Sequence, residues 1–464
     1  MLGNLGNPLK IAVIGSGPSG FYAAEALLKA NIDVRVDMFD RLPTPYGLVR
    51  GGVAPDHQKI KSVIMVYDKV AALPAFRFFG NVKLGQDIQV DDLSKFYHMI
   101  VYAVGNETDR KLGISGEDIH GSYSATSFVG WYNSHPDYRN EQFDLSCERV
   151  AVVGIGNVAM DVTRILAEDP EKLATTDIAG YALDALRKSK VKEIYLLGRR
   201  GPAQAAFSPA EIHEIGELEN ADLVLDPKEA ELDEVSKGEV LDINAKKNVE
   251  YLREHALKGE GSKSKKVRLR LCVSPVEILG KDGKITAVKL EKNKLVRDQK
   301  GSIAALGTGV FETISVDMVF RSVGYRGVPI AGVPFDQKSG RIPNVEGRVT
   351  DIQTKQPILG HYVVGWAKRG PSGLIGTNRA DSQATVKNML ADIASVSETP
   401  LIPSSSKDVA PWLKDKDVQF VSFQDWKSLD KIELERGKAN GKIREKFSRV
   451  SDMLSSVNQE TPVL

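Results

Sequence analysis

The sequence IAVIGSGPSG, at residues 11–20, decides the fold class that we predict for this chain. The short apolar run Ile11–Ile14 is typical of a buried parallel strand, and a helical pattern follows the turn Gly15-Ser16-Gly17. In such a strand–turn–helix unit, backbone N–H groups and a helix N-terminus can face a pyrophosphate. One loop of this kind is weak evidence, because glycine-rich turns also serve tight packing.

A second stretch with the same layout, VAVVGIGNVA, occupies residues 150–159, about 140 residues further on. Its glycines are Gly154 and Gly156, and its third small position holds Ala159 instead of glycine. Two such loops predict two dinucleotides held side by side, and therefore electron transfer between them. We expect an α/β protein with two Rossmann-like nucleotide-binding domains, each a parallel sheet with helices outside.

Length and charge exclude several classes of protein. A chain of 464 residues can hold two or three domains with ample core. Its 62 basic and 61 acidic residues nearly balance, so no overall field favours a nucleic-acid partner. No apolar stretch is long enough to span a bilayer, and Met1–Lys10 resembles neither a signal peptide nor a transit sequence.

The two cysteines, Cys147 and Cys272, lie far apart and outside any paired spacing. This spacing disfavours a disulfide framework, a zinc site and a redox-active Cys-x-x-Cys pair. We therefore expect no metal site, two buried cysteines and a soluble protein of a reducing compartment.

An acidic residue follows the first loop at the expected spacing. The strand-like run Val34–Phe39 ends at Asp40, 20 residues after Gly20. A carboxylate at this point can accept hydrogen bonds from ribose hydroxyls and repels a 2′-phosphate, which fits the adenosine of FAD or NAD and argues against NADP. The alternative is a capping or solvated aspartate.

Two arginines take the corresponding place after the second loop. The run Ile194–Leu197 is followed by Gly198 and then by Arg199 and Arg200, whose guanidiniums suit bidentate contact with the 2′-phosphate of NADP(H). The spacing of about 40 residues exceeds the usual ~20, and a helical stretch at 179–188 fills the excess. A solvated arginine pair is the alternative.

A third glycine-rich segment lies at 362–378, between a strand-like run and a helical run from Thr377 to Leu390. A helix N-terminus there can direct N–H dipoles at the N1/O2 edge of a flavin, which becomes anionic on reduction. Trp366 can cover a flavin or nicotinamide face, although a lone tryptophan is more often part of a core.

These segments and their flanks closely resemble the adrenodoxin reductase family of NADPH–ferredoxin reductases. The resemblance covers nearly the whole chain. It implies FAD and NADPH as cofactors and a small iron–sulfur ferredoxin as electron acceptor. The further motifs that carry it are Pro45–Arg50, Gly52–His57, Phe128–Asn133, Gly198–Pro202, Val421–Trp426 and Gly441–Lys446.

The resemblance and the loops together assign residues to each cofactor. The FAD contacts are Gly15, Gly17, Ser19, Gly20, Asp40, Leu48, Leu84, Trp366, Gly373, Leu374 and Ile375. The NADP contacts are Gly154, Gly156, Asn157, Val158, Arg199, Arg200, Glu211 and Gly373. The resemblance also implies a supporting polar relay near the nicotinamide, formed by His57, Asp161 and Glu211. The chain departs from the family at Asp40, where a longer glutamate is common, and at Ile155, where glutamine is common.

The motif order predicts a split FAD domain. Strand-like His98–Val104 leads out of the first half and Val319–Tyr325 leads back. We therefore expect a FAD domain at 1–106 and 325–464, with a C-terminal extension from about 400, and an inserted NADP domain at 107–324. Pro400–Pro411 is interpreted as a surface connection.

Lysines and arginines gather at 246–270, with Arg253 in a run that is similar to the family's docking helix. A basic face would steer an acidic ferredoxin, but a charged run of this kind is more often simply a solvated surface.

Other functions stay open at this point: a flavin oxidoreductase with another acceptor, such as a monooxygenase or quinone reductase, or a nucleotide-binding regulator without turnover. The sequence is compatible with a bacterial cytoplasm or, after loss of a transit peptide, a mitochondrial matrix.

Overall fold

The computed structural model describes residues 2–397 and 408–460. The chain forms two compact units. Unit 1 contains residues 1–53, 57–108 and 325–464, and unit 2 contains residues 54–56 and 109–324. We predicted boundaries at 106/107 and 324/325, so the units differ from that division at residues 107–108 and 54–56. Each unit is described here by itself.

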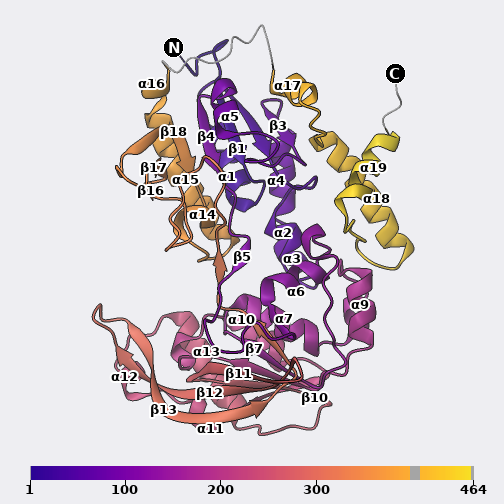
Figure 1. The fold of residues 1–464 in the computed structure, drawn as a ribbon, viewed down its shortest axis with the longest axis vertical. Coiled ribbons are helices and arrows are strands. Elements are labelled where there is room, and N and C mark those ends of the chain that lie inside the picture. The colour runs from indigo at the N-terminus through magenta and orange to yellow at the C-terminus, as the bar shows by residue number, and fades with distance from the viewer. Residues whose placement is uncertain (1, 398–407, 461–464) are drawn as a thin grey trace. The chain divides into compact units, whose positions relative to one another are not determined.

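Unit 1 is built on a seven-stranded sheet with the order β16-β17-β18-β4-β1-β2-β3 (Figure 1). Strands β18, β4, β1, β2 and β3 run parallel, and β16 and β17 are antiparallel additions at one edge. The strands are β1 (Leu9–Ile14), β2 (Val34–Phe39), β3 (Phe76–Phe79), β4 (Met99–Tyr102), β16 (Asn344–Val345), β17 (Arg348–Thr350) and β18 (Pro357–Val363).

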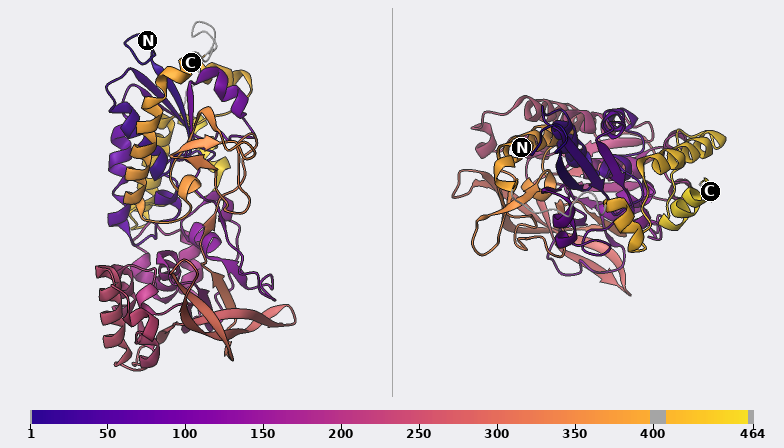
Figure 2. Two further views of the ribbon diagram at one scale, coloured as in Figure 1. Left: turned by 90° about the vertical axis from the view of Figure 1, so that its left-hand side faces the viewer. Right: turned by 90° about the horizontal axis from the view of Figure 1, so that it is seen from above.

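The apolar run of β1 is continuous because both faces of this sheet are covered. Ile11 and Val13 belong to one hydrophobic core, and Ala12 and Ile14 belong to another. The first core packs α1 and α15 against the sheet, and these two helices run along each other (Figure 2). The helices of unit 1 are α1 (Pro18–Leu28), α2 (Leu48–Gly51), α3 (Gln58–Lys61), α4 (Ile64–Ala71), α5 (Val90–Phe96), α14 (Trp366–Arg369), α15 (Ile375–Ala391), α16 (Ile393–Val396), α17 (Val409–Asp415), α18 (Phe423–Ala439) and α19 (Val450–Glu460).

The C-terminal extension enters unit 1 as α17, α18 and α19. Most of the predicted connection at 400–411, namely 400–407, lies outside the described residues. Its last part is helical, because α17 begins at Val409 with Asp408 as its N-cap.

Unit 2 contains a six-stranded, wholly parallel sheet with the order β6-β14-β7-β8-β10-β9. Its strands are β6 (Ser122–Ser124), β7 (Arg149–Val153), β8 (Glu193–Leu197), β9 (Ala221–Leu225), β10 (Lys265–Arg270) and β14 (Met318–Arg321). Its helices are α6 (Ala125–Tyr132), α7 (Asn157–Ala167), α8 (Pro170–Leu173), α9 (Gly180–Arg187), α10 (Pro209–Gly216), α11 (Pro227–Ala230), α12 (Glu234–Lys237) and α13 (Ile243–Ala256), with 3₁₀ turns at Pro136–Tyr138 and Pro202–Gln204.

The predicted α/β class with two Rossmann-like parallel sheets is confirmed. Unit 2 also carries an antiparallel sheet that we did not predict, formed by β11 (Val273–Lys281), β12 (Lys284–Arg297) and β13 (Ile303–Ser315). The short strands β5 (Thr108–Asp109) and β15 (Tyr325–Arg326) pair where the chain passes from one unit to the other. Across the described ranges, every helix is too short or too polar to traverse a bilayer.

Candidate nucleotide sites

The first glycine loop follows β1 and leads into α1. Gly15 has φ +105°, and a Cβ there would lie 2.4 Å from the carbonyl oxygen of Ala103. A Cβ on Gly20 would lie 2.1 Å from the carbonyl oxygen of Gly15. These two glycines therefore allow the turn and the close approach of α1 to β1.

Gly17 has a different role, because it faces open space. It is the N-cap of α1, and no side chain caps the helix there. No described atom lies within 4 Å of the position that its Cβ would take. Uncapped backbone N–H groups beside open space are what a pyrophosphate requires, so this loop fits the FAD that the sequence predicts.

Asp40 lies where β2 ends, but its carboxylate is already engaged within the loop. One oxygen accepts hydrogen bonds from the backbone N–H and the hydroxyl of Ser16, at 2.9 and 2.5 Å, and the other accepts from the N–H of Leu42 at 2.9 Å. A carboxylate offers about four acceptor positions, so ribose contact stays compatible with these bonds. Ser16 is fully buried, and its two hydrogen bonds hold the Asp40 carboxylate in place, a role that we did not predict.

The third glycine-rich segment lies beside the first loop. A Cβ on Gly365 would come within 2.5 Å of Ser19 Oγ, and Ser382 Oγ donates to the carbonyl of Ser19 at 2.9 Å. Helix α15 begins at Ile375, two residues before the predicted start, and Leu374 at its N-cap is 64% exposed. The predicted contacts Gly373, Leu374 and Ile375 thus form an accessible helix N-terminus.

The other predicted FAD contacts, Trp366, Leu84 and Leu48, lie in three different surroundings. The indole N–H of Trp366 is buried and has no hydrogen-bond partner in the part of the chain that the structure describes. This N–H is therefore available to donate to a ligand. Leu84 is buried in one core with Ile14 and Phe39, and Leu48 begins α2.

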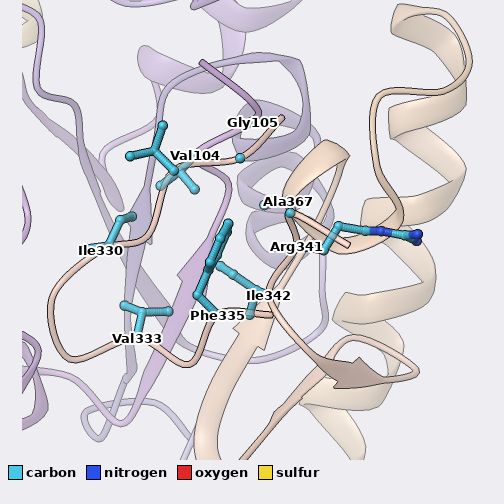
Figure 3. Close-up of a pocket in the computed structure, with 11 residues that line it drawn as sticks. Val104, Gly105, Ile330, Val333, Phe335, Arg341, Ile342 and Ala367 are labelled. Atoms are coloured by element: carbon cyan, nitrogen blue, oxygen red, sulfur yellow. The ribbon is translucent and has the colours of Figure 1, made fainter. Parts of the chain in front are cut away.

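A small apolar cavity lies beside the carboxyl end of β4 (Figure 3). Val104 and Gly105 line one side, and Ile330, Val333 and Phe335 line another. The predicted contact residues do not line it, and apolar loop residues such as these gave no sequence signal.

The second loop, in unit 2, repeats the glycine geometry of the first. Gly154 has φ +124°, and a Cβ there would lie 2.2 Å from the carbonyl oxygen of Ser322. Gly156 is the N-cap of α7 without a side-chain cap, and no described atom lies within 4 Å of its Cβ position. Asn157 Oδ1 accepts from the N–H of Ser208 at 3.1 Å, while Val158 packs against the core.

Arg199 and Arg200 follow β8, as predicted, and no carboxylate of the described residues neutralises their positive charges. Neither guanidinium forms an ion pair with any described residue, in contrast to Arg164 and Arg268 of the same unit. Burial and the adjacent Arg199 charge lower the pKa of Arg200. Two neighbouring guanidiniums without carboxylates form a site for an anion, which fits the 2′-phosphate of NADP(H).

Asp161 and Glu211 are brought together by a residue that we had not singled out. Arg164, 3% exposed, lies 2.6 Å from Asp161, 2.7 Å from Asp56 and 3.2 Å from Glu211. Burial would lower the pKa of Arg164, but these three carboxylates outweigh it and hold that pKa well above its ordinary value. His57 belongs to unit 1, where it is the N-cap of α3, so the relay of His57, Asp161 and Glu211 stays a prediction.

Four of the nine lysines and arginines at 246–270 are paired with carboxylates. Arg253 pairs with Glu231 at 2.7 Å and Lys266 pairs with Asp222 at 2.6 Å. Arg268 and Arg270 each contact two glutamates. The structure therefore weakens the interpretation of this region as a basic docking face.

Neither cysteine forms a disulfide. Burial is the main cause that raises the pKa of Cys147 to about 12 and that of Cys272 to about 11. A thiol with a raised pKa is a poor nucleophile, so neither cysteine is suited to thiol–disulfide exchange.

Comparison with known proteins finds close relatives. Residues 9–176 match the family described as "Pyridine nucleotide-disulphide oxidoreductase". NADPH-ferredoxin reductase FprA of Mycobacterium tuberculosis is 44% identical over 458 residues, covering 96% of this chain and 98% of that protein. The mitochondrial NADPH:adrenodoxin oxidoreductase of Arabidopsis thaliana is 40% identical over 466 residues, covering 97% and 95%.

The fold agrees with a solved relative at the same level. The structure of Mycobacterium tuberculosis FprA in complex with NADPH has a TM-score of 0.92 and 43% identity, and the match covers 97% of this chain and 100% of that one. The resemblance inferred from the sequence motifs is confirmed.

Proposed function

This chain belongs to the adrenodoxin reductase family of NADPH–ferredoxin reductases, and we propose that it is a flavoprotein that passes electrons from NADPH through FAD to a small iron–sulfur ferredoxin. One observation carries the proposal: two open glycine loops differ in the charge that follows them. The loop at Gly17 is followed by Asp40, and the loop at Gly156 is followed by the unpaired Arg199 and Arg200.

The residues of the chain bind and orient the two nucleotides. The N–H groups at Gly17 and Ser19 receive the FAD pyrophosphate, and those at Gly156 and Asn157 receive that of NADPH. Arg199 and Arg200 hold the 2′-phosphate and select NADPH over NADH. FAD, when bound, supplies a group that takes up a hydride and releases electrons singly.

Proximity and orientation carry the hydride step, so no protein acid is needed. The N-terminus of the 17-residue helix α15 would supply N–H dipoles that favour negative charge on a bound flavin. Arg164 orients Asp161 and Glu211. We assign these two carboxylates and, separately, His57 supporting roles toward the nicotinamide.

The relatives come from bacteria and from a mitochondrion, and we propose one of the two corresponding compartments, a bacterial cytoplasm or a mitochondrial matrix. The low nucleophilicity of both cysteines disfavours a disulfide substrate.

The deciding experiment measures NADPH-dependent reduction of cytochrome c by the purified protein, with and without an added ferredoxin. We expect a flavin absorption band and a rate that depends on the ferredoxin, while ferricyanide is reduced without it. Protein that neither contains nor takes up FAD would exclude the proposal. Cytochrome c reduction that is indifferent to ferredoxin would indicate another acceptor, and oxygen uptake coupled to NADPH would indicate a monooxygenase.

A further inference from the structure

Tyr46 has a strained backbone at the edge of the first glycine loop. Its φ is +85°, a region that residues other than glycine rarely adopt. Its N–H donates to the carbonyl of Ser16 at 3.0 Å. A Cβ on the next residue, Gly47, would lie 2.8 Å from Gly17 Cα. Residues 45–52, which we call the Tyr46 loop, therefore lie against the residue that faces the pyrophosphate position.

The side chain of Tyr46 is held by helix α18, nearly 400 residues further along the chain. The indole N–H of Trp426 donates to the Tyr46 hydroxyl at 3.1 Å, and both side chains are buried. That hydroxyl donates in turn to Asp68, and Lys427 pairs with the same carboxylate at 3.2 Å. Together these contacts fix the position of the Tyr46 hydroxyl.

The other end of the Tyr46 loop is held by the same extension. Arg50 donates to both oxygens of Glu433, at 2.8 and 2.5 Å, and Glu433 is fully buried. The Arg50 guanidinium lies 4.9 Å from the centre of the Trp426 ring. Lys446 donates to the carbonyl of Arg50 at 3.1 Å. A strained segment persists only where its surroundings over-determine it, and here the surroundings come from residues 426–446.

We propose that the C-terminal extension, residues 408–460, positions the FAD loop: Trp426 and Glu433 hold the Tyr46 loop against Gly17 and thereby set the affinity for FAD. The inference rests on the proposed function in one respect, since it takes the first glycine loop as the FAD site. Trp426 and Glu433 are positioning residues, because they act through Tyr46 and Arg50.

The test compares conservative variants in FAD binding. Trp426→Phe keeps an aromatic ring and removes the N–H that reaches Tyr46, and Tyr46→Phe removes the hydroxyl. Each apoprotein is titrated with FAD, and binding is followed by quenching of flavin fluorescence. We expect Trp426→Phe to raise the FAD dissociation constant roughly fivefold, the effect of one lost buried hydrogen bond. Tyr46→Phe should raise it at least as much, because it also loses the bond to Asp68. Adding Trp426→Phe to Tyr46→Phe should cause no further loss, because Tyr46→Phe already removes the bond that Trp426 donates.

A matched control separates positioning from general packing. Trp412→Phe lies in α17 of the same extension, where its ring packs against Phe96 at a centroid distance of 5.3 Å. We expect this control to bind FAD like the wild type, and the NADP⁺ dissociation constant to stay unchanged in every variant. An unchanged FAD dissociation constant in Trp426→Phe, or an additive loss in the double variant, would overturn the inference. A wild-type protein without FAD affinity would instead overturn the proposed function.

Discussion

The two glycine loops use one backbone geometry for two selectivities. In both, the first glycine has a positive φ, +105° at Gly15 and +124° at Gly154, and a Cβ there would collide with a carbonyl oxygen of the adjacent strand end. In both, the second glycine opens a helix and faces empty space. The difference lies in what surrounds this shared frame, so pyrophosphate binding and nucleotide selectivity are separable properties of the fold.

The largest expected effect is the loss of one nucleotide without loss of the other. Gly17→Val places a branched side chain where open space receives the FAD pyrophosphate, and Gly156→Val does the same for NADPH. We expect Gly17→Val to purify without flavin and Gly156→Val to stay yellow but lose NADPH-dependent reduction. Flavin absorbance and NADP⁺ titration check both. A full flavin content in Gly17→Val would show that the loops have been assigned wrongly.

The next largest effect concerns the charge after the second loop. Replacing both Arg199 and Arg200 by alanine removes two or three charge-assisted bonds of about 1.5–3 kcal/mol each. We expect the preference for NADPH over NADH to fall about a hundredfold or more, through the Michaelis constant for NADPH. Steady-state rates with each nucleotide measure it, and the flavin content serves as control. Equal use of both nucleotides by the wild type would contradict the assignment.

A smaller effect follows from the third position of each loop. Gly20 has no room for a Cβ, whereas Ala159 already carries one and is fully buried. Gly20→Ala should therefore lower the free energy of unfolding by about 1–3 kcal/mol through overpacking. Ala159→Gly should cost only about 1 kcal/mol, from lost helix propensity and packing. Thermal unfolding of the two apoproteins compares them, and an equal loss in both would mean that the loops pack alike.

The smallest effect is expected at the residue between the first two glycines of each loop, Ser16 in the first and Ile155 in the second. The Ser16 hydroxyl donates a hydrogen bond to Asp40, whereas Ile155 packs at the edge of the core beside Gly198. Ser16→Ala removes the hydroxyl bond but keeps the N–H bond, so the FAD dissociation constant should rise by about one order of magnitude or less. Ile155→Ala is the matched control, and it should leave FAD binding unchanged. A wild-type FAD affinity in Ser16→Ala would show that the hydroxyl bond from Ser16 to Asp40 does not contribute to FAD binding.

The local pattern of the sequence was sufficient for the loops and the class of the fold. Strand, glycine turn and helix lie within about 20 residues of one another, and glycine is the residue type that tolerates their φ angles and close contacts. Asp40 follows β2 directly and Arg199 follows β8 after one glycine, so their place at the end of the sheet could be predicted from the order of elements. Family motifs supplied the remaining candidates, including His57 and Trp366.

Only the tertiary structure decided which charges stay available. The sequence shows a cluster of cations at 246–270 and a pair at Arg199 and Arg200, but it does not show which of these cations pair with carboxylates. In the fold Arg253, Lys266, Arg268 and Arg270 of the cluster pair with carboxylates from other elements, while Arg199 and Arg200 pair with none among the described residues. The antiparallel sheet β11-β12-β13, the carboxylates around Arg164 and the bond from Trp426 to Tyr46 escaped prediction for the same reason. Contacts between distant residues depend on how the elements pack, and no local periodicity encodes them.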